Sequence, residues 1–169
     1  MTLRTIVQPT EPAVSVEDAK AFLRVVHDED DAMIGRMIAA AQDKAEQITG
    51  RALTARELEA LFEPEERAAL PMPPIIDILA VSDDEGDLEY ETRVEHGLTV
   101  VDPERRDGQL AVRYQAGYET VPDAVVQWIL VQVSSMYEQR ESFGRGADTT
   151  PMFRTFVDHL LDSYRMRIV

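Results

Sequence analysis

Carboxylate and imidazole side chains are the groups in this chain that could carry chemistry. The acids form two runs, Asp28-Glu29-Asp30-Asp31 and Asp83-Asp84-Glu85-Gly86-Asp87. The second run lacks the loop length and the distal bidentate glutamate of an EF-hand, so its Asp and Gly residues favour a hairpin turn over a calcium site. The first run precedes an apolar helical pattern and favours a solvated helix N-terminus. A metal site there is the weaker alternative, because consecutive carboxylates at a helix start point in different directions.

The histidines do not form a recognisable site. His27, His96 and His159 are far apart, and none has a second histidine three or four residues away, so zinc spacings fail. His159 stands between Phe156 and Leu160, which favours a position beside a core or an interface. The chain has no cysteine, and Gly144-Arg145-Gly146 is too short for a phosphate loop and follows no strand. We therefore predict no catalytic residue, no metal site, no cofactor and no enzymatic activity.

Composition indicates one acidic globular domain. The chain has 169 residues, of which 44% are hydrophobic and 29% are charged, with a net charge of −15. Such a chain is unsuited to binding nucleic-acid backbones, because affinity for phosphate comes from Lys and Arg side chains. The charge provides either solubility alone or a surface past which a polyanion slides without sticking. No apolar run is long enough to span a bilayer, and Met1–Arg4 has no signal-peptide character, so we expect no membrane contact and a cytoplasmic origin.

The N-terminal half is predicted to be helical after an extended arm. Residues 1–14 contain two prolines and no clear period, and Ser15-Val16-Glu17-Asp18 then has the pattern of a capping box. A short helix ends near His27. A second helix begins at the acidic run, carries a continuous apolar stripe and stops at Gly50, giving a helical pair over 15–50. Residues 54–62 favour another helix by propensity.

The rest of the chain divides into strands and then helices. Strand-like segments at 75–81, 88–94, 98–101 and 110–114, separated by turn residues, predict a small antiparallel meander over 71–115. Two wide apolar stripes, starting at Pro122 and at Thr150-Pro151, predict a helical pair over 121–165. Trp128 lies on the flank of the first stripe. The fold class expected for residues 1–169 is therefore α+β, mostly α, with helix pairs on either side of the meander.

Ten short motifs follow one another over most of residues 15–165. They are Ser15–Lys20, Leu23–Val25, Asp28–Asp31, Ile38–Ala41, Glu46, Thr49–Leu53, Leu70–Ile75, Tyr114–Tyr118 with Val121-Pro122, Met136–Glu141 and Leu160–Arg165. Their order resembles that in the head–tail connector (adaptor) proteins of long-tailed bacteriophages, prophages and gene-transfer agents. The resemblance implies a strand after Leu53, where propensity favours a helix.

The resemblance also implies a structural role without catalysis. Members of this family assemble as a ring, dodecameric on the virion, between the portal protein and the tail-side head-completion or tail proteins. DNA passes through the ring without specific binding. By this resemblance the chain is made in the bacterial host cytoplasm and located at the virion neck, where it takes part in assembly and DNA packaging. The candidate interface residues are those of the late helices and the basic, apolar C-terminal tail, namely Trp128, Tyr137, Phe143, Phe153, Phe156, Arg165, Arg167 and Ile168.

Two other functions are compatible with the sequence. An acidic protein-binding module or regulator without catalytic activity would also work through surfaces. A small hydrolase would have to assemble carboxylates such as Asp28, Glu29 and Asp83 around a divalent metal.

Overall fold

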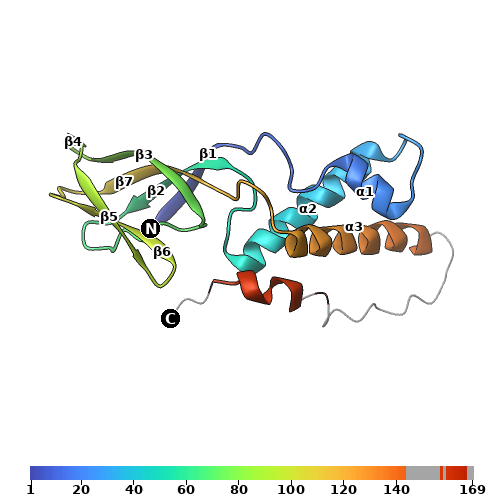
Figure 1. Ribbon diagram of the computed structural model, residues 1–169. Helices are drawn as coiled ribbons and strands as arrows, with labels where there is room; N and C mark the ends of the chain where they lie inside the picture. The colour runs from blue at the N-terminus through green and yellow to red at the C-terminus, as the bar shows by residue number, and fades with distance from the viewer. Residues whose placement is uncertain (144–156, 158, 167–169) are drawn as a thin grey trace. The chain divides into compact units, whose positions relative to one another are not determined.

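The computed structural model describes residues 1–143, 157 and 159–166 (Figure 1). The chain forms two units, each with its own core. The helical unit comprises Glu11–Thr49 and the described residues of Thr120–Met166, and the β unit comprises Met1–Thr10 and Gly50–Glu119. Within the described residues, no helix is both long and apolar enough to cross a membrane.

The helical unit begins at the predicted capping box. Helix α1 spans Val16–Leu23, and the Ser15 hydroxyl accepts a hydrogen bond from the Asp18 amide at 3.0 Å and donates one to the Asp18 carboxylate at 2.6 Å. Arg24 ends the helix in the left-handed conformation, three residues before the predicted end. Helix α2 spans Asp31–Thr49, and Gly50 follows it with a φ of 70°. The predicted starts and the glycine stop are therefore confirmed.

The core of the helical unit lies between α2 and α3, which spans Asp123–Phe143. The apolar stripes predicted from the sequence supply its buried side chains, joined by one residue of the 3₁₀ helix η1 (His159–Tyr164). The largest of these are Ile34, Ile38, Trp128, Ile129 and Leu161. Most of the second late helix, expected from Thr150, falls outside the described residues, so the C-terminal helix pair stays a prediction.

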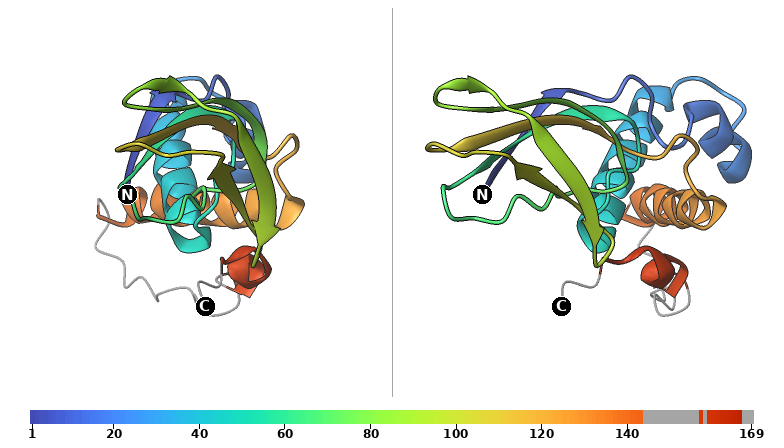
Figure 2. Two further views of the ribbon diagram at one scale, coloured as in Figure 1. Left: turned by 90° about the vertical axis from the view of Figure 1, so that its left-hand side faces the viewer. Right: turned by 60° about the vertical axis from the view of Figure 1, so that its left-hand side comes forward.

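The β unit contains two antiparallel sheets. Five strands form the larger sheet in the order β1-β2-β7-β3-β4, and the left view of Figure 2 shows β1, in blue, at one side of the strands. Strands β5 and β6 form a separate hairpin. The bounds are β1 Thr2–Val7, β2 Arg56–Phe62, β3 Ile75–Asp83, β4 Gly86–Asp87, β5 Tyr90–Glu95, β6 Leu98–Pro103 and β7 Leu110–Ala116.

The helix that propensity favours over residues 54–62 is wrong. Strand β2 pairs with β1 along one edge and with β7 along the other. Leu58, Ala60 and Phe62 point into the core at 2%, 0% and 1% exposure, while the residues between them are more exposed. Two ladders of backbone hydrogen bonds and this buried face outweigh the helix preference of Arg, Glu, Leu and Ala. The strand implied by the family resemblance is the correct alternative.

The sheet is larger than the predicted meander. All four predicted strands exist, but β1 and β2 are added, and β7 lies between β2 and β3 instead of following β6 at an edge. The extended arm over 1–14 therefore contains a strand that is part of the sheet. These additions give helices and strands similar shares of the described residues, so "α+β" is right and "mostly α" is wrong.

Candidate protein interface

The predicted interface residues do not share one environment. Trp128 is 2% exposed, so its indole packs inside the helical unit instead of on the flank of α3. Tyr137 is half-buried, and its hydroxyl donates a 2.6 Å hydrogen bond to the Asp30 carboxylate. Phe143 is the last residue of α3. Arg165 is exposed and lies 3.3 Å from the Asp162 carboxylate. Phe153, Phe156, Arg167 and Ile168 lie outside the described residues.

One ammonium group and one hydroxyl group of the same unit contact the first acidic run. The Lys20 ammonium lies 2.5 Å from the Asp28 carboxylate and 2.7 Å from that of Asp31, and Tyr137 holds Asp30. The hydrogen bond from Lys20 lowers the pKa of Asp28, and the same contact raises the pKa of Lys20. The run is thus an exposed helix start, as expected, and Lys20 and Tyr137 also contact it.

The second acidic run forms the expected hairpin turn. Strands β3 and β4 pair through Asp83 and Gly86, and Gly86 adopts a φ of 136°. The Asp83 carboxylate accepts backbone hydrogen bonds from Asp107 at 3.0 Å, Glu85 at 2.9 Å and Gly86 at 3.2 Å. The Asp107 amide contributes most to lowering the pKa of Asp83. Asp83 is therefore a turn-forming anion, whereas a general acid needs a raised pKa.

The histidines likewise have structural surroundings. His159 lies on η1 with a 73% exposed side chain, and its Nδ1 is 2.7 Å from the Asp162 carboxylate. Its expected place beside a core is therefore wrong for the protomer, and a place at an interface stays a prediction. Among the residues that the structure describes, no three His, Asp or Glu side chains gather as a metal-binding group.

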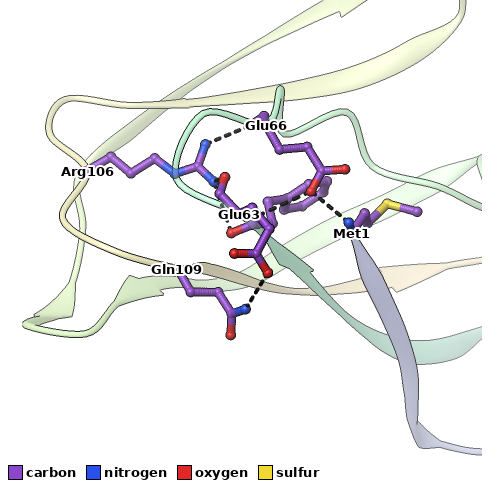
Figure 3. Close-up of polar contacts among 6 residues, drawn as sticks. Met1, Glu63, Glu66, Arg106 and Gln109 are labelled. Carbon is purple, nitrogen blue, oxygen red and sulfur yellow. Dashed lines mark hydrogen bonds and ion pairs between the residues drawn. The ribbon is translucent and has the colours of Figure 1, made fainter.

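One polar cluster in the β unit is not foreseeable from the sequence. Arg106, in the connection between β6 and β7, donates hydrogen bonds to three carbonyls at the end of β2 and in the loop after it, as Figure 3 shows in part. The Glu66 carbonyl is 2.6 Å away and the Phe62 carbonyl 3.0 Å. Gln109 donates to the Glu63 carboxylate at 3.1 Å. The two loops are thus fixed to each other, and an arginine in a turn-like run gives no sequence signal of this role.

The N-terminus joins the same cluster. The Met1 ammonium lies 2.7 Å from the Glu66 carboxylate, and this contact lowers the pKa of Glu66 (Figure 3). The pair fixes the start of β1 beside the end of β2, where Thr2 is paired with Leu61. Strand β1 is thereby held at the edge of the sheet.

Comparison with known families identifies a match over the segment that contains both early helices and strands β2 and β3. Residues 13–86 match the model of the family described as phage gp6-like head-tail connector protein. The resemblance to head–tail connectors is confirmed.

Solved structures extend the similarity to the whole chain. A chain in the neck of an empty gene transfer agent (GTA) particle, computed with C6 symmetry, has a TM-score of 0.78 and 17% identity, with 100% of this chain and 97% of that chain covered. A chain in the virion of a native gene transfer agent particle has a TM-score of 0.76 and 19% identity at the same coverage. A chain in the neck of the native particle, computed with C12 symmetry, has a TM-score of 0.71, 18% identity and the same coverage. At these identities the likeness shows the fold. A comparison with curated protein sequences gave no match.

Proposed function

We propose that this chain is a head–tail connector, a structural component of the virion neck made in the bacterial host cytoplasm. It forms a ring of twelve copies that joins the portal protein to the tail-side proteins and lets DNA pass through without specific binding. It has no catalytic role.

One observation carries this proposal above the others. The fold of the chain matches that of neck proteins over its full length, and residues 13–86 independently match the connector family. A regulator or binding module would have no reason to meet both conditions. The symmetries named for the particle necks, C6 and C12, are those that a ring of twelve copies satisfies.

Ring formation sets a physical requirement on the protomer. Head-to-tail contacts that close by rotation need two different surfaces on each copy. On the helical unit, the remaining candidates of the predicted set, without the buried Trp128, are Tyr137, Phe143, Phe153, Phe156 and Arg165. The tail residues Arg167 and Ile168 are candidates for docking on the portal protein, since they add basic and apolar character to an acidic chain.

The net charge of −15 suits a passage for DNA. Acidic side chains facing the lumen repel the phosphate backbone and keep DNA from binding to the wall. Replacing lumen-facing acids by lysine is expected to slow DNA packaging or ejection. Unchanged packaging and ejection would remove this part of the proposal.

The direct experiment deletes the gene from its phage, prophage or gene-transfer-agent cluster and examines the particles by electron microscopy. We expect heads and tails that fail to join, and joined particles when the full chain is supplied from a plasmid. A complementing chain that lacks Met166–Val169 tests the tail: normal folding with weak attachment to portal is expected. Normal joined particles in the deletion strain would refute the connector role.

A further inference from the structure

The larger sheet of the β unit has two edges to which no further described strand is paired. At one edge, β1 pairs with β2 and with no other described strand. At the other, β3 pairs with β7, while β4 pairs only with Ser82 and Asp83. Residues 75–80 of β3 therefore have an unpaired side, and this segment is as long as β1.

Large hydrophobic side chains are exposed on both open edges. Leu3, Ile6 and Val7 on β1 are 38%, 42% and 47% exposed, and Ile76 and Leu79 on β3 are 49% and 45% exposed. Edge strands usually avoid further pairing through charged residues, prolines or bulges. The irregularities of β3 fall at Ile76 and Leu79, and that of β1 at Ile6, so each extra residue is hydrophobic. Both edges thus carry bulges, which discourage pairing, but the residues at these bulges are exposed and hydrophobic, and their burial by a partner is favourable.

Strand direction determines what kind of partner fits. Strands β1, β2, β7 and β3 alternate in direction, so β3 runs opposite to β1. A copy of the chain rotated about an axis along the strands presents its own β1 in the original direction. That strand is antiparallel to β3 and can extend the ladder. Because the two edges differ, such a contact is head-to-tail and can close into a ring.

Charges on one face of the sheet set the register. Arg4 lies opposite Glu59, and Asp77 lies opposite Gln115, both on strands whose alternate residues are buried. Arg4 and Asp77 thus project on the same, outer face, and both are exposed. Among the described residues neither has an ion-pair partner; the Asp77 carboxylate accepts only the Ile78 amide, at 2.9 Å. Opposite charges facing each other across two strands stabilise their pairing.

The same register also pairs apolar residues on the core-facing side of the sheet. Leu3 lies opposite Ala60, and Ile78 lies opposite Tyr114, so both point to the side of the core. An antiparallel arrangement with Arg4 opposite Asp77 places Leu3 opposite Ile78. One register therefore joins a charged pair on the outside and an apolar pair on the inside.

We propose that β1 of one protomer pairs with residues 75–80 of β3 in the next protomer, so that a second copy of this chain covers each open edge and the sheet continues around the ring. This inference rests on the proposed ring and specifies its β contact.

Disulfide cross-linking tests the contact, since the chain has no cysteine. The full-length variant with Arg4→Cys and Asp77→Cys is oxidised after assembly and run on a non-reducing gel. Each copy carries one thiol on each edge, so we expect a ladder of covalent oligomers up to the ring. A bond within one copy is excluded, because three strand spacings separate the thiols by roughly 14 Å, whereas a disulfide spans about 4–7 Å between Cα atoms.

Each single cysteine variant is expected to give no ladder. The matched control joins Asp77→Cys to Arg36→Cys, an exposed position on α2, and is also expected to give none. Charge reversal is a second test. Arg4→Asp or Asp77→Arg alone should raise the protein concentration needed for ring assembly about fivefold, and the variant with both changes should restore the wild-type concentration.

The outcomes separate this contact from the connector role. Rings detected by light scattering, without a ladder in the double cysteine variant, would overturn the edge pairing and leave the connector role intact. Abundant dimers from Arg4→Cys alone would show β1 paired with β1, which also overturns it. A protein that forms no ring in solution or on particles would refute the proposed function, and this contact with it.

Discussion

The close packing of the backbone around Gly117 in the β unit can be tested quantitatively. It follows β7 with a φ of 136°, and its amide donates to the Pro74 carbonyl at 2.9 Å. A Cβ built there lies 2.5 Å from the Thr54 carbonyl carbon and 2.6 Å from the Ala55 nitrogen, both backbone atoms that cannot rotate away. The backbone conformation alone costs a non-glycine residue about 1–3 kcal/mol. The overlap adds about 1–3 kcal/mol, so Gly117→Ala is expected to lower the free energy of unfolding by about 2–6 kcal/mol.

Gly86 provides the matched control because it has the same φ of 136° and nothing within 4 Å of its built Cβ. Gly86→Ala should therefore cost only the backbone strain, about 1–3 kcal/mol. Urea unfolding of both variants, followed by circular dichroism, gives the difference directly. Equal losses of stability in the two variants would refute the argument that the Thr54-Ala55 backbone leaves no room for a side chain at Gly117.

Two further predictions concern the polar contacts of the β unit. Arg106→Lys keeps the charge but loses the planar guanidinium that reaches several carbonyls, so it should lower the free energy of unfolding by about 2 kcal/mol. The control Arg113→Lys alters an exposed ion pair with Glu57 and should lower it by under about 1 kcal/mol. Similar urea midpoints for the two variants would contradict this prediction. Asp83→Asn should destabilise the protein at neutral pH. Because the folded-state pKa of Asp83 lies below the ordinary 3.8, its contribution is complete above that value and disappears as the pH falls through the folded-state pKa. The difference in the free energy of unfolding between wild type and variant should therefore become smaller in acid. A difference that does not depend on pH would disprove this prediction.

The helical unit could be predicted well because its signals are local. The Ser15 cap, the apolar stripe of α2 and the glycine after Thr49 act over a few residues, and each does what the pattern indicates. The interface residues were harder to predict. A wide apolar stripe indicates that a helix packs against several neighbours, but it does not show whether those neighbours belong to the same copy of the chain. Trp128 is buried in the core of its own protomer.

Strands β1 and β2 show where local reasoning fails. Arg56–Phe62 consists of residues that favour helices, and only its alternating burial, visible once β7 and β1 flank it, identifies a strand. Thr2–Val7 has no period because every residue of this edge strand is exposed. The sheet order, the Arg106 cluster and the two open edges likewise depend on pairs of residues distant in sequence.

The sequence by itself determined the starts of α1, α2 and α3, the glycine stop of α2, four of the strands, the acidic character and the family resemblance, because caps, turns, periodicity and charge are encoded within short segments. The tertiary structure alone decided that residues 56–62 form a strand, that β7 lies inside the sheet, and which hydrophobic side chains remain exposed. Long-range hydrogen bonding and burial are properties of segments brought together, and propensities of a few tenths of a kcal/mol per residue yield to them.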